Sequence, residues 1–492
     1  MKTSTSSHLS GRRRPLAACC AALFGLAAPE AYASSSWLVT SCNDDGAPGT
    51  LRYVIANQAQ SGDTVDMTGL NCSSISLATG AIGIPQASLT VQGPGVTHFP
   101  IVGNAVADTI FYHTGTGTLF VNDLNLEHGN GHKLGNGLYL GGCIFSSGNV
   151  MLTRSRLTGC QVYNPSSTYA GAADGGCIAT LGNLFLSHST ITGCIVDAAP
   201  ANTGALYGGG AFVGGNLTVK YSEISNNLAG FANYGIYSKG GGVIARGNAA
   251  IYESTISNNA SRYQSGGIHI ESTVSGATAT ITNSTISGNQ APKVGGLYSN
   301  EPTTISNSTI AFNIKRSQSG LSAGAVFSAK QWPVNVTLHS TLIANNQFVR
   351  PFPTPPVDND LGVANVGTYA VTFATDAQQG NFNLVLALDS SVSSASLPPD
   401  TIIGKCPLLA PLRDNGGETK THALYSGSPA IDAGVNNLGL AYDQRGGPQP
   451  VPNPIPPPPL AYDRHSGVRT DIGAYEVQRT DVVFDSGFEG CP

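Results

Sequence analysis

The sequence predicts an all-β protein built as a right-handed parallel β-helix, a solenoid with an N-terminal cap and a C-terminal capping module. Three observations carry this prediction. A short phrase recurs along the chain at intervals of about thirty residues. Its apolar residues alternate with the period of two that is typical of strands. Paired glycines open most repeats, as a tight corner with positive φ requires.

The repeated phrase reads "ITNSTISGN" at Ile281 to Asn289 and "ISNSTIAFN" at Ile305 to Asn313. Each copy has an aliphatic anchor, a serine two positions earlier, and a cysteine or asparagine three positions later. The anchors are Leu157, Ile191, Ile224, Ile256, Ile286, Ile310 and Leu342. The serines are Ser155, Ser189, Ser222, Ser254, Ser284, Ser308 and Ser340. The third column is Cys160, Cys194, Asn227, Asn259, Asn289, Asn313 and Asn345.

These columns are predicted to be scaffold. Equivalent positions of a solenoid lie over one another, so like residues can form hydrogen-bonded ladders along the stack. The extra residue before each serine shifts the alternation, which indicates a bend between two short strands. We expect units of three short strands, stacked into roughly eight to ten coils.

The composition excludes one class of partner. Only 11% of the 492 residues are charged, and the net charge of −5 comes without a long block of one sign. Nucleic-acid binding needs clustered basic residues, so neither DNA nor RNA is expected. The sequence contains no GxSxG, HExxH or phosphate-loop motif, and no cofactor is predicted.

The N-terminus has the pattern of a secretory signal peptide. Arg12 to Arg14 precede an apolar run from Leu16 to Ala28, and "AYA" at Ala31 to Ala33 fits a cleavage site. A lipoprotein box ending at Cys19 and a twin-arginine signal fit less well. No later run approaches the ~18 apolar residues of a membrane-spanning helix. We expect an exported monomer, secreted or at the cell surface, with outer-membrane association as one option.

The expected organisation follows from these patterns. It is a signal peptide at 1–33, a cap with the first coils at 34–100, β-helix repeats at 101–400, an anchor-like module at 401–477 and a tail at 478–492.

Four cysteines lie in register with the repeats. Cys143 and Cys177 are one full repeat apart, as are Cys160 and Cys194, whereas Cys143 to Cys160 and Cys177 to Cys194 each span half a repeat. Disulfides between coils and within a coil are both compatible with this spacing. No CxxC spacing occurs and no histidine recurs with the thiols, which disfavours a metal site.

The two ends resemble known exported proteins. "VTSCNDDGAPGTLRYVIANQAQSGDTVDM", Val39 to Met67, is similar to the N-terminal caps of bacterial surface β-helix proteins. "PLRDNGGETKTHALYSGSPAIDAG", "DQRGGP" and "TDIGAYE" resemble the choice-of-anchor Q domain family, in which varied C-terminal anchors follow a β-helix. The glycine-rich repeats are similar to those of polymorphic outer-membrane proteins. The resemblance implies a pectate-lyase-like β-helix at the bacterial surface and assigns no activity.

A solenoid needs caps because each end exposes an unpaired strand edge. Leu51, Val54, Ile55 and Ala59 form the apolar face of a predicted capping helix. A disulfide between Cys42 and Cys72 is expected to hold this cap. Cys406 and Cys491 are left to pair across the C-terminal module.

Two hypotheses remain for the surface. Polysaccharide cleavage needs facing carboxylates or a base with a cation or Ca²⁺. The candidate catalytic cluster consists of Glu223, Glu253, Arg154, Arg156 and His188, and a solvated face is the alternative explanation. Asp358 and Asp360 are the candidate calcium ligands, and the "HIE" motif places His269 and Glu271 on one strand face.

Binding requires less than catalysis does. Exposed tyrosines suit sugar contacts because each ring has an apolar face and a polar tip. Tyr207, Tyr234, Tyr237 and Tyr263 precede predicted strands. We therefore expect adhesion, with bacterial polysaccharides or host cell-surface glycans as partners and no catalysis. A polysaccharide lyase or glycoside hydrolase is the alternative.

Overall fold

The computed structural model describes residues 34–103, 108–166, 172–199, 204–230, 237–272, 275–317, 322–350, 354–446, 462–464, 467, 469–478 and 481. The chain divides into a short unit up to Ser34 and one large unit from Ser35 onward. The expected signal peptide lies outside the described residues.

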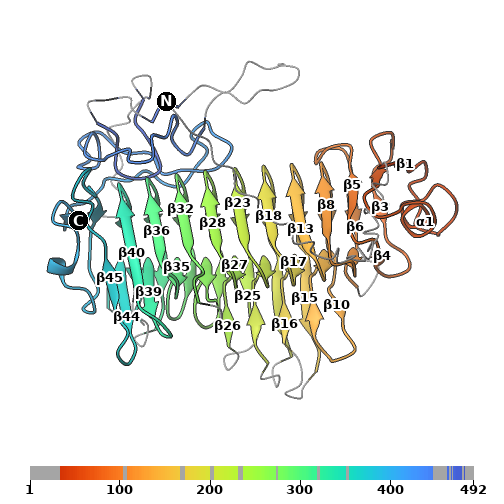
Figure 1. The fold of residues 1–492 in the computed structure, drawn as a ribbon, viewed down its shortest axis with the longest axis horizontal. Helices are drawn as coiled ribbons and strands as arrows, with labels where there is room; N and C mark the ends of the chain where they lie inside the picture. Colours follow the sequence, from red (N-terminus) through yellow and green to blue (C-terminus); the bar gives the residue numbers. More distant parts are fainter. Residues whose placement is uncertain are drawn as a thin grey trace, which may run out of the picture. The chain divides into compact units, whose positions relative to one another are not determined.

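The large unit is a parallel β-solenoid of about nine turns, as predicted (Figure 1). Its right-handedness stays a prediction. One α-helix, α1 (Leu51–Asn57), occurs among the described residues, where the capping helix was expected. Leu51, Val54 and Ile55 are buried on it, and the Thr50 hydroxyl caps its N-terminus by accepting from the Tyr53 N–H at 3.2 Å. No helix in the described part of the chain is long and apolar enough to cross a bilayer.

Five sheets run along the solenoid axis, named here in the order in which each turn visits them. Sheet 1 contains β1 (Ser36–Leu38), β2 (Thr64–Asp66), β5 (Leu89–Gln92), β8 (Thr118–Asn122), β13 (Asn149–Thr153), β18 (Leu184–Ser187), β23 (Leu217–Lys220), β28 (Ala249–Tyr252), β32 (Ala279–Thr282), β36 (Thr303–Ser306), β40 (Val334–His339) and β45 (Val371–Phe373). Sheet 2 contains β3 (Ile75–Ser76), β6 (Pro100–Val102), β9 (Asn125–Glu127), β14 (Arg156–Thr158), β19 (Thr190–Thr192), β24 (Glu223–Ser225), β29 (Thr255–Ser257), β33 (Thr285–Ser287), β37 (Thr309–Ala311), β41 (Leu342–Ala344), β46 (Leu384–Val385) and β47 (Ile402–Ile403).

The other three sheets complete the turn. Sheet 3 contains β15 (Gln161–Asn164), β20 (Ile195–Ala198), β25 (Leu228–Ala229), β30 (Ala260–Ser261), β34 (Gln290–Ala291), β38 (Ile314–Lys315), β42 (Gln347–Phe348) and β43 (Val357–Asp358). Sheet 4 contains β10 (His132–Lys133), β11 (Tyr139–Leu140), β16 (Ala173–Asp174), β21 (Leu206–Tyr207) and β26 (Ser238–Lys239). Sheet 5 contains β4 (Ile82–Ile84), β7 (Phe111–His113), β12 (Ile144–Ser146), β17 (Ile178–Thr180), β22 (Ala211–Val213), β27 (Val243–Ala245), β31 (Ile268–Ile270), β35 (Leu297–Ser299), β39 (Ala325–Ala329) and β44 (Leu361–Asn365).

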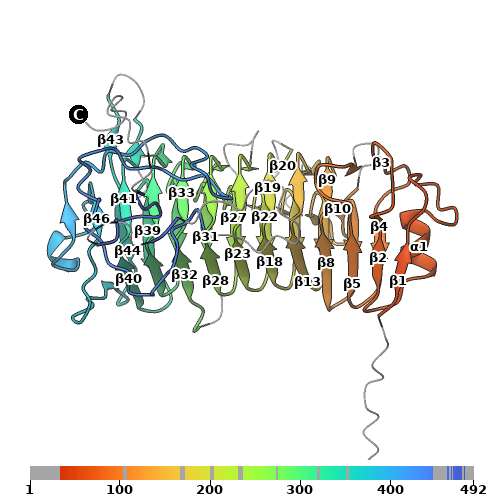
Figure 2. The same ribbon diagram turned by 90° about the horizontal axis from the view of Figure 1, so that it is seen from above.

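The middle turns have five strands, two more than predicted. Sheets 1, 2 and 5 run most of the length, while sheets 3 and 4 cover part of it (Figure 2). Their strands are mostly only two residues long and interrupt the longer connection from sheet 2 to sheet 5. Such short segments show no alternation that sequence periodicity could detect.

The core follows the predicted alternation. Leu184 and Leu186 point inward from β18, over Val150 and Leu152 of β13. The anchors Leu157 and Ile191 pair in register in sheet 2, and both are fully buried. Each turn thus adds its apolar residues to one continuous core.

The serine column forms a hydrogen-bonded ladder between turns, in which the backbone N–H of one serine donates to the hydroxyl of the next. The hydroxyl of Ser189 accepts a hydrogen bond from the Ser155 N–H at 3.1 Å and donates to the Ser187 carbonyl at 2.8 Å. Four further steps repeat the first of these contacts, from Ser189 to Ser222, Ser254, Ser284 and Ser308. The hydroxyls satisfy buried backbone groups at the bend, where the sheet 1 strand has ended.

The asparagine column forms a second, fully buried ladder. Asn289 accepts at its Oδ1 from the N–H and the Nδ2 of Asn259, at 3.0 and 2.9 Å, and donates from its own N–H and Nδ2 to Asn313. The last acceptor is the Asp360 carboxyl, which receives the N–H and Nδ2 of Asn346 at 2.8 and 2.7 Å. Burial raises the pKa of Asp360 to about 8.

The predicted alignment is wrong by one residue in the last repeat. Ile310 pairs with Ile343 rather than Leu342, and Thr341 rather than Ser340 occupies the serine position. Asn346, not Asn345, continues the asparagine ladder. The pairing of β36 with β40 continues into the bend without an insertion, with Ser306 opposite His339, so Ser340 takes the bend position of Asn307 and adopts φ 45°. The letters Ser340-Thr341-Leu342 reproduce the serine and anchor spacing one residue too early.

The bend itself was predicted correctly. The residue before each ladder serine adopts a left-handed conformation, with φ between 44° and 49°. These residues are Arg154, His188, Tyr221, Glu253, Asn283 and Asn307. Left-handed backbone is uncommon for residues other than glycine, so the stacking on both sides of the bend compensates the local strain.

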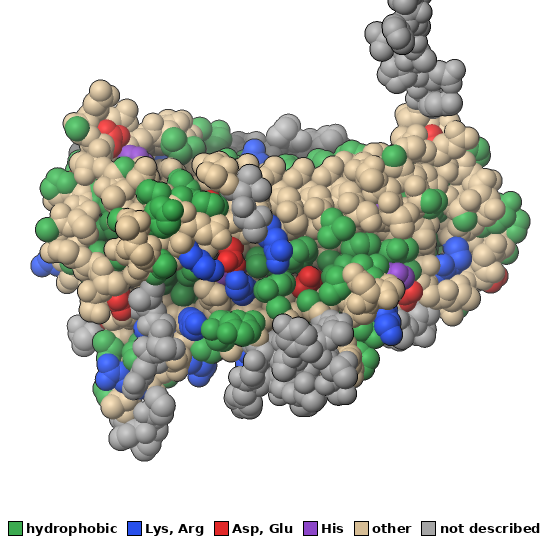
Figure 3. All heavy atoms as spheres, turned by 60° about the horizontal axis from the view of Figure 1, so that its bottom comes forward, with side chains coloured by type: hydrophobic (Ala, Val, Ile, Leu, Met, Phe, Trp, Pro, Cys, Tyr) green, Lys and Arg blue, Asp and Glu red, His purple; other side chains and the backbone are tan. Residues whose placement is uncertain are grey.

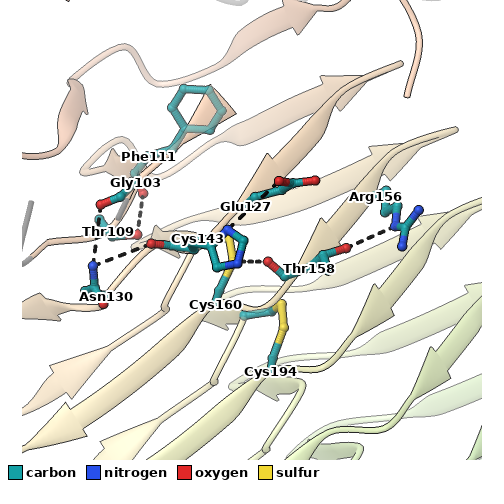
Figure 4. Close-up of a disulfide and its surroundings, with 12 residues drawn as sticks. Gly103, Thr109, Phe111, Glu127, Asn130, Cys143, Arg156, Thr158, Cys160 and Cys194 are labelled. Atoms are coloured by element: carbon teal, nitrogen blue, oxygen red, sulfur yellow. Dashed lines mark hydrogen bonds and ion pairs between the residues drawn. A yellow bond between two sulfur atoms is a disulfide. The ribbon is translucent and has the colours of Figure 1, made fainter. Parts of the chain in front are cut away.

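The cysteines pair within turns, which settles the alternative that the spacing left open. Cys143 bonds to Cys160 and Cys177 to Cys194, with Cα–Cα distances of 5.6 and 5.5 Å. Figure 4 shows the first of these bridges with Cys194 of the next turn beside it. Cys42 and Cys72 form the expected bridge at the N-terminal cap. Cys406 is disulfide-bonded, and Cys491 lies outside the described residues.

After β47 the chain returns along the outer face of sheet 2 (Figures 1 and 2). The Thr255 hydroxyl donates to the Lys420 carbonyl and the Thr285 hydroxyl to the Gln444 amide oxygen, each at 2.6 Å. The Ala474 N–H donates to the Thr309 hydroxyl at 3.0 Å. The outward threonines of sheet 2 therefore hold this C-terminal segment, residues 405–446, 462–464, 467 and 469–478, on the solenoid.

The quoted C-terminal motifs build the centre of this segment. Arg445 is buried between the rings of Tyr462 and Tyr475, each 3.9 Å from its guanidinium, and pairs with Asp443 at 2.8 Å. Asp443 also accepts from the Glu476 N–H at 2.8 Å. A buried charge requires such a partner and such hydrogen bonds. In the structure these motif residues stabilise the fold of the C-terminal segment.

The ladder predicts unequal costs for two asparagine substitutions. Asn289→Ala removes four hydrogen bonds and leaves the buried Asn259 backbone N–H without its acceptor, so we expect a loss of about 3 kcal/mol in the free energy of unfolding. Asn248→Ala, in an exposed ladder that contacts Thr278, should cost less than about 1 kcal/mol because water replaces its partners. Denaturant unfolding followed by circular dichroism measures both, and equal costs would contradict the buried ladder.

Candidate functional site

The structure places the predicted catalytic cluster against the C-terminal segment. Lys420 pairs with Glu223 at 3.1 Å, and His188 pairs with Glu418 at 3.1 Å. The Thr419 hydroxyl donates to the Glu253 carbonyl at 3.2 Å. These contacts account for three of the five candidates as parts of a docking interface.

The two arginines of that cluster lie apart from Glu253. Arg154 pairs with Asp123 at 2.7 Å, and Arg156 donates to the Thr158 hydroxyl at 3.0 Å. Glu253 is a bend residue whose buried Oε2 has no hydrogen-bond partner. Burial raises the pKa of Glu253 to about 7, although the Lys220 charge opposes this shift.

The candidate calcium ligands have different surroundings. Asp360 ends the asparagine ladder, and both of its oxygens accept protein hydrogen bonds. Asp358 lies at the end of β43 in sheet 3. The contacts of Asp360 therefore account for its carboxyl without a cation.

A different surface, at the angle between sheets 4 and 5, carries aromatic, basic and acidic side chains close together. In the sheet 5 strands from β7 to β39, one residue of each strand points outward and stacks in register on the next. This column is Tyr112, Phe145, Ala179, Phe212, Ile244, His269, Tyr298 and Val326. Facing it in sheet 4 is the column Leu140, Asp174, Tyr207 and Lys239. Members of the two columns pack into one apolar cluster.

Five tyrosines mark this surface, which we call the tyrosine face. They are Tyr112, Tyr207, Tyr237, Tyr263 and Tyr298. Tyr237 is 57% exposed and packs edge-on against Tyr263 at 4.6 Å, while Tyr112, Tyr207 and Tyr263 are partly exposed. Figure 3 shows a band of hydrophobic side chains along this side of the molecule, with basic and acidic side chains set into it. Tyr234, the fourth tyrosine of the sequence hypothesis, lies outside the described residues.

Basic side chains lie over these rings. The Arg246 guanidinium is 5.3 Å from the Tyr207 ring and 5.2 Å from the Phe212 ring. Lys293 Nζ is 4.1 Å from the Tyr263 ring centroid and donates to its hydroxyl at 2.8 Å. That hydrogen bond lowers the pKa of Tyr263. The face thus combines aromatic surface with positive charge.

Glu271 is a carboxylate of the tyrosine face whose position is held by contacts with three side chains. Its Oε2 contacts His269 Nε2 at 3.0 Å and the Lys239 ammonium, and Lys330 approaches its Oε1 at 3.5 Å. The hydrogen bond from His269 and the Lys239 charge lower the pKa of Glu271. The "HIE" motif was therefore right in placing His269 and Glu271 together.

His269 is buried, and its hydrogen bond to Glu271 fixes the position of that carboxylate. Its Nδ1 contacts the Ser265 hydroxyl at 3.0 Å, and its ring stacks on Tyr298 at 4.7 Å. Burial lowers the pKa of His269 to about 4, so the ring is neutral at pH 7. Ser265, His269 and a carboxylate resemble a nucleophilic triad in connectivity. Ser265 is fully buried and also accepts from the Gly240 N–H at 3.1 Å, so its hydroxyl has no access to a substrate.

Asp174 is the second acidic group of the face. It is 8% exposed, and its Oδ1 has no hydrogen-bond partner. Burial raises the pKa of Asp174 to about 7, against the opposing charge of Arg246. The carboxyl is therefore partly protonated near neutral pH, whereas Glu271 is ionised.

A second pattern in the sequence, the residues that precede the glycine pairs, could have predicted part of this face. The repeat of the serine and asparagine phrase did not reveal it. Asp174, Tyr207 and Lys239 each directly precede a glycine pair, and each is one repeat away from the next. Alignment on the glycine pairs would have stacked them. Their approach to the sheet 5 column required the angle between two sheets, which spacing alone does not give.

No family model, curated protein or solved structure matches this chain. The fold therefore rests on the structure, and the resemblance of the two ends stays a prediction.

The buried Asp174 predicts a pH-dependent stability. Its folded pKa of about 7 lies above the unfolded value near 3.8, so its contribution is fully present below about pH 4 and is lost as the pH rises toward 7. Asp174→Asn should leave stability unchanged at pH 4 and raise it at pH 8 by at most about 4 kcal/mol. Urea unfolding of both proteins across this range measures the difference. Asp45→Asn, at an exposed site, is the control, and a parallel effect there would contradict the assignment.

Proposed function

We propose that the protein is an exported β-solenoid that binds glycan chains on its tyrosine face. The observation that carries this proposal is the row of tyrosines with basic side chains over or beside their rings, on one side of successive turns. Such rings offer sugar an apolar surface and a hydroxyl at little cost in conformational entropy.

The geometry of the stack favours an extended polymer. Equivalent residues of adjacent turns repeat about every 4.8 Å along the axis. This spacing is comparable to the length of a sugar unit in an extended polysaccharide. A chain lying along the face would meet a contact at each turn, and many weak contacts would add up.

Export is supported by the disulfides. Three bridges join described cysteines, and such bonds persist in oxidising compartments. The resemblance of residues 411–476 to choice-of-anchor Q domains supports a place at the cell surface. In this proposal the C-terminal segment is structural, and the tyrosine face is left for adhesion.

Retention on immobilised polysaccharides tests the proposal. The chain from Ser34 to Pro492, with its disulfides formed, is applied to columns of neutral and acidic bacterial and plant polymers. We expect retention on at least one polymer and a drop of about tenfold in affinity for Tyr207→Ala, which removes one aromatic contact. Tyr163→Ala removes an exposed ring from sheet 3 and should change nothing. Retention of no polymer, or equal loss in both variants, would contradict glycan binding at this face.

Polysaccharide cleavage is the second candidate, and one observation favours it. Burial raises the pKa of Tyr207, and negative charge on both Asp174 and Glu271 adds to the shift despite Arg246. Both carboxyl groups therefore lie near one tyrosine, one partly protonated and one ionised. A general acid and a carboxylate of this kind are what glycoside hydrolysis uses.

Product analysis tests the second candidate. If the protein cleaves a retained polymer, Asp174→Asn and Glu271→Gln should each lower the rate of product formation at least about a hundredfold, because acid–base groups contribute that much. Reducing ends and unsaturated-product absorbance are followed with and without Ca²⁺. Glu223→Gln and Glu253→Gln, at the interface with the C-terminal segment, serve as controls. Retention without any product in the unsubstituted protein would exclude cleavage of that polymer.

A further inference from the structure

The charges on the tyrosine face do not balance. Four basic side chains lie on it, namely Lys239, Arg246, Lys293 and Lys330. Glu271 pairs with Lys239 and Lys330. Among the residues that the structure describes, no carboxylate oxygen lies within 4.0 Å of a side-chain nitrogen of Arg246 or Lys293.

The two uncompensated cations are positioned by rings. Arg246 lies beside Tyr207 and Phe212, at 5.3 and 5.2 Å. Stacking of this kind leaves the N–H groups at the edge of the guanidinium directed past the ring. Lys293 lies 4.1 Å from the centroid of Tyr263 and uses one of its three N–H groups on the Tyr263 hydroxyl. Both cations keep donors for a further acceptor.

The acidic group that interacts with Arg246 does not cancel this charge at mildly acidic pH. Asp174 acts on Arg246 electrostatically, but burial raises the pKa of Asp174 to about 7. Below that pH the carboxyl is mostly neutral. The face then carries positive charge although the whole chain has a net charge of −5.

We propose that the tyrosine face selects an anionic polysaccharide, whose acidic groups bind Arg246 and Lys293 while its sugar rings lie on Tyr207 and Tyr263. This inference rests on the proposed glycan binding and specifies its ligand class. Carboxylates of uronic acids and sulfate esters share the required chemistry, because both accept charge-assisted hydrogen bonds from guanidinium and ammonium groups.

Matched polymers isolate the charge from the sugar. The full exported chain is titrated at pH 6 with polygalacturonate and with its methyl ester, which has the same sugar and no free carboxylate. Dextran sulfate and dextran form the second pair. We expect at least about tenfold tighter binding of one charged member than of its neutral partner, as one charge-assisted hydrogen bond gives. The pair that responds identifies carboxylate or sulfate.

Variants locate the effect. Arg246→Gln and Lys293→Gln should each weaken binding of the charged polymer by about tenfold and leave binding of its neutral partner unchanged. Arg246→Lys keeps the charge and loses the planar fork, so it should restore part of the affinity. Arg316→Gln removes an exposed arginine from the end of β38 in sheet 3 and should have no effect. Circular dichroism confirms that each variant is folded, and Lys293→Gln provides a second variant should Arg246→Gln fail to fold.

Three other outcomes would each overturn part or all of the two proposals. Equal affinity for the charged and neutral members, with loss on Tyr207→Ala, would overturn the anionic ligand and leave glycan binding intact. An effect of Arg316→Gln as large as that of Arg246→Gln would overturn the location through non-specific charge. Failure to bind any of the four polymers, together with no retention on the wider panel, would overturn both proposals.

Discussion

Hydrogen bonding between equivalent strands of successive turns is the constraint on which the rest of this structure depends. A unit of a few short strands cannot bury its own apolar face, but a neighbour in register satisfies its backbone groups and covers its side chains. The register brings Ser155 over Ser189 and Asn259 over Asn289. A side chain that accepts a backbone hydrogen bond in one turn can therefore do the same in each turn that repeats it. The left-handed bends, at residues such as Arg154 and Glu253, are tolerated because the ladders on either side fix them.

Repetition also separates scaffold from chemistry. Where a column keeps the same residue, as in the serine and asparagine ladders, it satisfies buried backbone groups. Where a column changes, as from Leu140 to Asp174, Tyr207 and Lys239, the fold does not dictate the side chain. The tyrosine face consists of such changing positions.

The C-terminal segment alters which surfaces remain for binding. By docking on Thr255, Thr285 and Thr309 it covers part of the outer face of sheet 2, and it contacts Glu223 and Glu253, the carboxylates that the sequence alignment had favoured. Its own buried charges, such as Arg445 with Asp443, are satisfied internally. The ligand-binding capacity of the solenoid is therefore proposed for the opposite angle, between sheets 4 and 5.

The sequence predicted the β-solenoid, the ladders and the bend, because each follows from local periodicity at recurring positions such as Ile191 and Ser189. It predicted the cap helix from the spacing of Leu51, Val54 and Ile55. It did not determine the within-turn disulfides, since half a repeat and a full repeat both bring Cys143 near a partner. It misplaced Ser340, Leu342 and Asn345 by one residue, since Ser340 and Leu342 reproduce the serine and anchor spacing one position before the residues that stack in register. The contact of Glu223 with the C-terminal segment, and the shared face of Asp174, Arg246 and Glu271, are seen only in the folded chain. Those contacts join residues from different sheets and distant turns, and their proximity depends on the angle between sheets rather than on any spacing along the chain.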